Sequence, residues 1–303
     1  MDFRRLQLFL AASRHGNLTE AAAELEISQP ALSKSLKALE KSLGVRLLER
    51  GRFGVVPTPF GEALLAHGSA IEAELRNAEA EIDALKGAAR GHVLMGCGPT
   101  EANRLLPRAL MALARTHPHL KASVLYGLNE NLMPWVRNGE IDFALSSVPG
   151  RPSDPELAHD KLFEESGAVV ARAGHPLARR RSVPLADLLA QRWILPRRRE
   201  LERLAFDDLF RTHDLVPPEA TIETTSTVLM KSVVLHGDFL TFIPRELIYW
   251  EEKAGQLVAL PVAAGSWVRL VGITRRRRGS LSPAARAALD ALKAAAQEFA
   301  AAP

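Results

Sequence analysis

The spacing of hydrophobic residues predicts three short helices within the first 50 positions. Leu6, Phe9 and Leu10 fall on one face of a first helix, which we expect over about residues 3–14. A second helix is expected over residues 18–25, with small alanines at its centre that allow another helix to cross closely.

Polar residues mark where the second and third helices begin. Asn17 is a typical N-cap, and Glu20 follows three residues later as in a capping box. Ser28 is expected to cap the third helix, with Pro30 in the first turn, where a missing N–H costs nothing. Only two residues are left for the turn between these helices, which favours a helix-turn-helix arrangement.

The third helix is predicted to have two distinct faces. Its leucines recur at helical spacing and form a stripe expected to be buried: Leu32, Leu36, Leu39 and Leu43. Its lysines form a separate, exposed ridge: Lys34, Lys37 and Lys41. Gln29, Pro30 and Ser33 lie near its N-terminal end, beside Lys34. The helix therefore combines an anchoring face with a polar, basic face.

A glycine-rich stretch after this helix predicts a small β-wing. Gly44 ends the helix, and Arg50 and Arg52 lie in the segment that includes Gly51 and Gly54. The wing is expected to end at Pro57-Thr58, after which one long helix begins.

Residues 58–86 contain a heptad repeat. Apolar residues recur every seven positions (Leu64, Ile71, Ala78 and Leu85), with Phe60, Leu75 and Ile82 near the complementary seam. A helix of this length spans about 40 Å. Because such a rod needs a partner for its apolar seam, we expect a second copy of the chain to supply it.

The remaining residues alternate short apolar strands with helices, which predicts an α/β architecture with largely parallel sheets. The expected strands are Val93–Cys97, Ala122–Tyr126, Ile141–Leu145, Ala168–Ala171, Trp193–Leu195, Leu240–Ile243, Leu257–Leu260 and Val268–Thr274. The expected helices are Arg104–Ala114, Leu132–Asn138, Leu201–Phe210, Thr227–Leu235 and an alanine-rich helix opened by Ser282-Pro283.

Composition narrows the class of protein. The net charge is only +4, but residues 1–60 hold 9 basic against 6 acidic residues, and residues 61–90 hold 3 against 6. The placement of cations, rather than their total, must therefore carry any argument for phosphate binding. One cysteine, no apolar run of membrane-spanning length and no apolar secretion segment at the N-terminus lead us to expect a cytoplasmic protein without a membrane partner.

Several segments of the N-terminal region resemble the LysR-type transcriptional regulators. They are NLTEAA at 17–22, SQPALSK at 28–34, LE at 39–40, LGV at 43–45, LLER at 47–50, and Pro57-Thr58 followed by Gly61. One departure is Pro57, which stands where the family usually has an aliphatic residue. The segment Gly98-Pro99-Thr100-Glu101 and the wing are also similar to the galactose-binding-protein regulator subgroup.

The resemblance implies an organisation and a set of partners. It implies a winged helix-turn-helix DNA-binding domain (1–58), a linker and dimerisation helix (59–90), and a two-lobed effector-binding domain like the type 2 periplasmic binding proteins (91–303). Lobe I is expected over about 91–162 and 267–303, and lobe II over about 163–266. The implied partners are double-stranded promoter DNA, a small-molecule effector, further copies of the chain in a homodimer or homotetramer, and RNA polymerase. The pattern leaves activator and repressor equally open.

The major groove admits one helix and presents distinguishable base edges, so the polar face of the third helix is the expected reading surface. The resemblance places base contacts at Gln29, Pro30, Ser33 and Lys34. Phosphate or wing contacts are expected from Thr19, Ser28, Lys37, Lys41, Arg50 and Arg52. A solvated helix whose lysines serve solubility is the alternative.

Ligands of α/β proteins bind outside the carboxyl ends of parallel strands. The candidate effector residues at such ends are Gly98, Thr100, Asn129, Ser146, Trp193, Thr225, Ser226 and Phe242. For Thr225 and Ser226, helix capping is an equal alternative. Backbone N–H groups near Gly98 suit an anion, and a hydroxyl-rich cleft suits a sugar or a small carboxylate equally well.

Other features of the sequence are weaker indications of function. The run from Gly96 to Glu101 nearly matches a dinucleotide fingerprint, but its sixth position is glutamate, and we expect no cofactor. His117 and His119 form no metal-ligand set, and no enzyme motif is evident. Cys97 is either a buried small residue or a redox sensor. The arginine runs 179–181, 197–199 and 275–278 are either solvated loops or extra contacts to bent DNA. An exported solute-binding protein and a ligand-processing enzyme are the competing functions.

Overall fold

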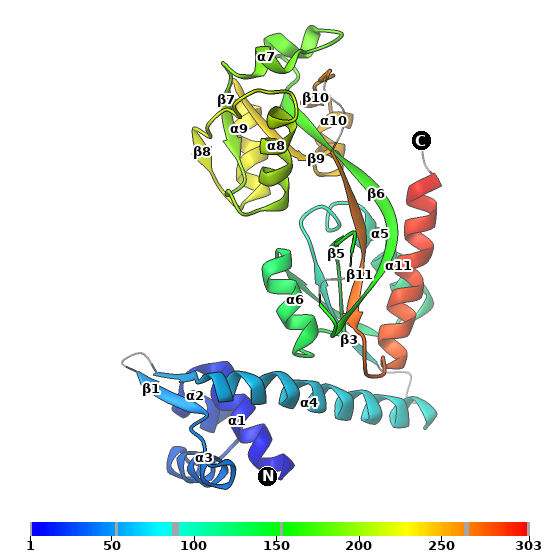
Figure 1. Ribbon diagram of the computed structural model, residues 1–303. Coiled ribbons are helices and arrows are strands. Elements are labelled where there is room, and N and C mark those ends of the chain that lie inside the picture. Colours follow the sequence, from blue (N-terminus) through cyan, green and yellow to red (C-terminus); the bar gives the residue numbers. More distant parts are fainter. Residues whose placement is uncertain (1, 52–53, 87–90, 152–153, 264–266, 302–303) are drawn as a thin grey trace.

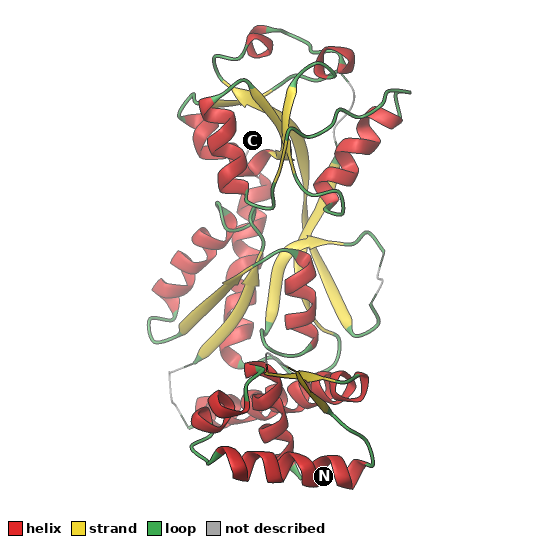
Figure 2. Cartoon of the chain, turned by 90° about the vertical axis from the view of Figure 1, so that its left-hand side faces the viewer, coloured by secondary structure: helices red, strands yellow, loops and turns green. Residues whose placement is uncertain are grey.

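The computed structural model describes residues 2–51, 54–86, 91–151, 154–263 and 267–301. It shows an elongated molecule in which one long helix lies between a small helical domain and a two-lobed α/β domain (Figures 1 and 2).

The N-terminal domain contains the three expected helices, α1 (Phe3–His15), α2 (Leu18–Glu24) and α3 (Gln29–Leu43). The side chain of Asn17 accepts a hydrogen bond from the backbone N–H of Thr19 at 2.8 Å, and that of Ser28 accepts one from Ala31 at 3.4 Å. Leu32, Leu36 and Leu39 are buried in the shared core, as expected. Leu43 is 41% exposed instead, because it is the last residue of α3 and the chain turns away at Gly44, where φ is +72°.

Strands β1 (Leu48–Gly51) and β2 (Gly54–Pro57) form the predicted antiparallel wing. The wing is attached to the helices by two contacts. The carboxylate of Glu40 on α3 accepts hydrogen bonds from the backbone N–H groups of Leu47 and Leu48, and the N–H of Val55 donates to Gly16 O at 2.7 Å. A Cβ at Gly54 would lie 2.0 Å from that same Gly16 oxygen, so only glycine permits this approach.

The long helix α4 (Pro59–Leu85) is capped by Thr58, whose hydroxyl accepts a hydrogen bond from Gly61 N. One face of α4 contacts both neighbouring domains: Gly68 packs on leucines of α1, and the Asn77 amide donates to Ser280 O at 2.7 Å. The other face exposes the large residues of the heptad pattern, namely Phe60, Ile71, Leu75, Ile82 and Leu85. Leu64 of the heptad pattern is half-buried against the N-terminal core, and the exposed residues of the seam are not covered by any described part of the chain.

A mixed sheet in the order β4-β3-β5-β11-β6-β9-β7-β8, with β10 beside β6, runs through both lobes. Its strands are β3 (His92–Cys97), β4 (Lys121–Tyr126), β5 (Phe143–Val148), β6 (Leu157–Arg172), β7 (Arg192–Leu195), β8 (Ile222–Glu223), β9 (Phe239–Pro244), β10 (Leu257–Ala259) and β11 (Val268–Arg276). Strands β4, β3 and β5 are parallel to one another, as are β9, β7 and β8.

The expectation of largely parallel sheets is wrong at the centre of this sheet. There β6 and β11 are antiparallel to each other, and both run from one lobe into the other (Figure 1). The 16-residue β6 was predicted only over 168–171, because its first half contains several charged residues and no continuous apolar run.

Helices cover both faces of the sheet in each lobe. They are α5 (Leu105–Thr116), α6 (Asn129–Arg137), α7 (Leu185–Leu188), α8 (Leu201–Arg211), α9 (Thr227–His236), α10 (Tyr249–Lys253) and α11 (Pro283–Ala301), with short 3-10 turns η1 (Pro176–Arg179) and η2 (Arg245–Ile248). Alternation along β5 shows the layering, because Phe143 and Leu145 pack toward α5 and α11 whereas Ala144 packs toward α6. In lobe II, α8 and α9 occupy opposite sides in the same way.

Candidate DNA-contact surface and ligand cavity

Helix α3 lies at the end of the molecule away from the two lobes (Figure 1). Pro30, Lys34, Lys37 and Lys41 are exposed, and Gln29 and Ser33 are half-buried. Buried Leu32, Leu36 and Leu39 hold the opposite face against α1 and α2. The structure therefore brings four base-contact candidates and two phosphate-contact candidates onto one helix.

The remaining DNA-contact candidates surround that helix. Thr19 is exposed at the start of α2, and Ser28 is exposed at the cap of α3. Arg50 lies in β1 of the wing, and Arg52 lies outside the described residues.

Between the lobes is a cavity of about 150 Å³. Five candidate effector residues line it: Gly98, Thr100, Asn129 and Ser146 from lobe I, and Thr225 from lobe II. They converge because β3 and β5 end on this side and α6 and α9 begin there. The Asn129 amide donates to the carbonyl and the hydroxyl of Ser147, both at 2.9 Å.

Three candidate effector residues do not reach the cavity. Trp193 is fully buried among the aromatic rings of lobe II, with its indole N–H donating to Leu188 O at 3.1 Å. Phe242 is 2% exposed and packs on Phe206 and Trp267. Both lie on strands whose two faces are covered, so their side chains point into the core beside α8. The Ser226 hydroxyl caps α9 by accepting from Leu229 N, the alternative role considered for it.

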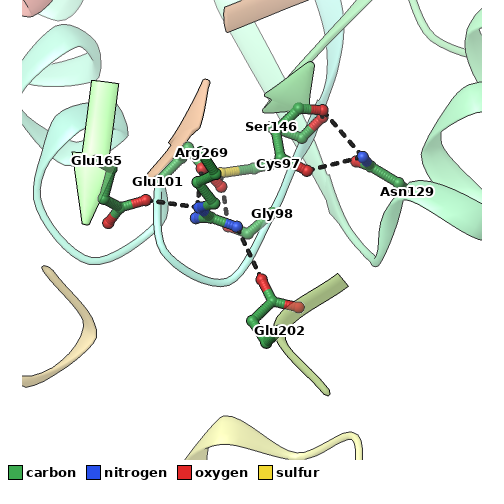
Figure 3. Close-up of polar contacts among 9 residues, drawn as sticks. Cys97, Gly98, Glu101, Asn129, Ser146, Glu165, Glu202 and Arg269 are labelled. Atoms are coloured by element: carbon green, nitrogen blue, oxygen red, sulfur yellow. Dashed lines mark hydrogen bonds and ion pairs between the residues drawn. The ribbon is translucent and has the colours of Figure 1, made fainter. Parts of the chain in front are cut away.

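The structure shows a cavity residue that sequence reasoning missed, Arg269 on β11. Its Nε donates to Glu165 at 2.7 Å, its Nη1 to Glu202 at 3.0 Å and its Nη2 to Glu101 at 3.1 Å (Figure 3). Glu202 begins α8 of lobe II and Glu101 follows β3 of lobe I, so this cluster joins the lobes. A charged residue within the otherwise apolar run 268–273 was the available signal, because a buried charge requires partners.

Arg269 donates hydrogen bonds to three carboxylates in this cluster, and burial raises the pKa of two of them. Burial raises the pKa of Glu165 to about 7, although the Arg269 charge opposes that shift. Burial likewise raises the pKa of Glu101 above its usual range. A Cβ at Gly98 would lie 2.4 Å from a Glu101 carboxylate oxygen, so a larger residue there would displace that carboxylate.

The structure also shows where Cys97 and the three arginine runs lie. Cys97 is buried, and burial together with Glu101 raises the pKa of its thiol, so the thiol stays protonated. In the run 275–278, the side chain of Arg276 is only 11% exposed and lies near Glu74 of α4, and Arg277 donates to Pro155 O and Leu157 O. Arg276 links the lobe to α4, so the solvated-loop expectation is wrong for this residue, whereas Arg277 is exposed. Runs 179–181 and 197–199 are exposed.

The described residues contain no group of three side chains arranged to hold a metal ion. None of the helices in the described part of the chain has the length and apolarity needed to span a bilayer.

Two family models match the chain. Residues 3–62 match the bacterial regulatory helix-turn-helix protein, lysR family, and residues 86–297 match the LysR substrate binding domain. Together they span most of the sequence and agree with the division between the helical domain and the lobes.

Known proteins are similar over nearly the whole length. The regulator GbpR of Azospirillum brasilense is 36% identical over 97% of this chain and 86% of its own. The SDS degradation transcriptional activation protein of a Pseudomonas strain is 32% identical over 94% of each. A full-length OxyR variant from Pseudomonas aeruginosa shares the fold with a TM-score of 0.70 at 24% identity, over 98% of this chain and 95% of that one. The chain thus belongs to the LysR family of DNA-binding transcription regulators, with a substrate-binding effector domain, and not to a family of enzymes.

Proposed function

We propose that α3 enters the major groove and that Gln29, Pro30, Ser33 and Lys34 contact base edges. Supporting this, Leu32, Leu36 and Leu39 hold the apolar side of α3 in the core, while Pro30 and Lys34 are exposed on its other side. A glutamine can bond an adenine edge with two hydrogen bonds, and a lysine reaches guanine acceptors.

Thr19, Ser28, Lys37, Lys41, Arg50 and Arg52 are proposed to contact the DNA backbone. Exposed cations beside a reading helix attract phosphates of either strand and fix the register of the protein without reading sequence. The wing is fixed to α3 through Glu40, so its position follows that of the helix.

The effector is proposed to bind in the cavity between the lobes, in contact with Gly98, Thr100, Asn129, Ser146 and Thr225. The single observation that carries this proposal is the convergence of these five residues, from both lobes, on one cavity. A ligand touching both lobes changes the free energy of their closure, which is how binding is transmitted to the DNA-binding domain.

We also propose that two copies pair through the exposed apolar seam of α4, and that dimers combine into a tetramer. Large apolar side chains repeating along a rod are stabilised when a second rod covers them. The proposed ranges are 1–58 for DNA binding, 59–90 for dimerisation and 91–303 for effector binding. The promoter partner places the protein in the cytoplasm, where RNA polymerase is a further partner.

An electrophoretic mobility shift on the promoter region beside its own gene tests this function. We expect a salt-sensitive shift at nanomolar protein, and a weaker one on unrelated DNA. Equal binding to both sequences, or no binding, would contradict a sequence-specific regulator.

A further inference from the structure

The lining of the inter-lobe cavity has an excess of acidic side chains. Two arginines, Arg199 and Arg269, stand against four glutamates, Glu101, Glu130, Glu200 and Glu202, among the lining residues that the structure describes. The ligand charge that the cavity accepts therefore depends on the ion pairs and hydrogen bonds that these side chains already make.

Arg269 is occupied by the protein itself. Its Nε, Nη1 and Nη2 each donate to a different carboxylate at 2.7 to 3.1 Å, and its side chain is only 10% exposed. Three of its five N–H groups are therefore already used by carboxylates of the protein, and an anionic ligand that replaced one of these glutamates would leave a buried carboxylate without its partner, which is costly. Arg269 thus balances the protein's own acids.

Two acidic residues that line the cavity come from different lobes, Glu130 and Glu200, and we call this pair the rim. Glu130 lies in the first turn of α6 in lobe I, and Glu200 directly precedes α8 in lobe II. Burial raises the pKa of Glu200, and the nearby carboxylates of Glu202 and Glu130 raise it further against the effects of the backbone N–H and side chain of Arg197. A ligand that donates hydrogen bonds relieves this repulsion, whereas a ligand with a carboxylate adds to it.

Three helix N-termini near the cavity would favour an anionic ligand, but side chains of the protein already occupy them. Helices α6, α8 and α9 begin at lining residues, and each N-terminus carries roughly half a positive charge. Glu130 and Glu202 occupy the first turns of α6 and α8, and the Ser226 hydroxyl caps α9. Because these side chains already offset the positive potential of the helix N-termini, little of it remains for an anionic ligand.

We propose that the cavity selects a small ligand that carries no negative charge and offers several O–H or N–H donors to Thr100, Asn129, Ser146 and the surrounding carboxylates. About five waters fill 150 Å³ at roughly 30 Å³ each, which sets the size near that of a monosaccharide or a small amine. This proposal rests on the proposed function and specifies the class of its effector.

Ligands of similar size and shape that differ in charge test the proposal on the full-length protein. The probes are D-glucose, D-glucuronate and D-glucosamine, together with benzamide, benzoate and benzylamine, each titrated by calorimetry and by thermal shift. The neutral or amine member of at least one set should bind, with the acid of that set at least tenfold weaker. An acid that binds as tightly as its partners, or no binding by any probe, would overturn the proposal.

A charge-neutral variant sharpens the test. Glu130→Gln combined with Glu200→Gln keeps the shape of the rim and removes two negative charges, so the affinity for the acid probe should rise about tenfold relative to that for the neutral probe. Glu219→Gln, at an exposed position outside the cavity lining, is the matched control and should change neither. Unchanged acid affinity in the double variant would contradict the proposed role of the rim.

The readouts separate this inference from the regulator function. Every variant is also assayed for a shift of promoter DNA, which does not depend on the ligand's charge. A chain that binds promoter DNA but prefers acids refutes the ligand class alone. A chain that fails to bind DNA refutes the regulator function whatever the probes show.

Discussion

The surface of α3 and the cavity between the lobes assemble their functional residues in different ways. On α3, the candidate contacts lie within 13 residues, from Gln29 to Lys41, and one helix positions them all. In the cavity, the partners of Arg269 are 168, 104 and 67 residues away along the chain, on elements of both lobes. The first surface depends on local helical structure, and the second depends on tertiary packing, so the two should respond differently to substitution.

The largest expected difference between the two regions is in stability, and it comes from removing Arg269, the counter-ion of the glutamates at the cavity. Arg269→Ala leaves Glu101, Glu165 and Glu202 in a buried site without their cation, and should lower the free energy of unfolding of the lobes by about 3 to 5 kcal/mol. Chemical denaturation followed by tryptophan fluorescence reports this, because the buried Trp193 lies in lobe II.

The control for this prediction is Arg172→Ala, which breaks a solvent-exposed ion pair with Asp238 and should cost less than about 1 kcal/mol. Equal effects of the two substitutions would show that the buried cluster is not what joins the lobes. Substitutions on the polar face of α3 should leave the unfolding of the lobes unchanged.

A second prediction uses pH. The pKa of Glu165 is raised to about 7, so the folded protein binds a proton more tightly than the unfolded chain, and the stability from this group is lost as pH rises from about 4.5 through 7. The wild type should therefore gain about 2 kcal/mol more than Glu165→Gln when pH falls from 8 to 5.

Comparing the two proteins removes the contributions of other groups. His159 and His175, whose pKa values burial lowers, titrate in the same window with the opposite sign and are present in both. Parallel stability curves for wild type and Glu165→Gln would rule out the raised pKa.

The sequence predicted those features whose determining residues are close together in the chain. The caps of α2 and α3 lie within three residues of the groups they bond, and helical spacing alone separates Lys37 from Leu36. Trp193 was misplaced because a strand end suggests exposure, whereas the rings of α8 cover that strand in three dimensions. Arg269 was missed because its partners are distant in sequence.

The smallest predicted effect distinguishes capping from ligand contact at two neighbouring residues. Ser226→Ala should cost about 1 kcal/mol of stability and leave ligand affinity unchanged, because its hydroxyl caps α9. Thr225→Ala should weaken ligand binding with little effect on stability, because Thr225 lines the cavity. Thermal unfolding and calorimetry check both, and the reverse pattern would exchange their roles.

Specific DNA recognition by α3 is tested most directly by comparing Gln29→Ala with Lys37→Ala on operator and unrelated DNA over a range of salt concentrations. Gln29→Ala should reduce the preference for the operator by about tenfold or more with an unchanged salt slope. Lys37→Ala should weaken binding to both DNAs alike and lower the slope by about one. Unchanged operator affinity in both variants would contradict the account.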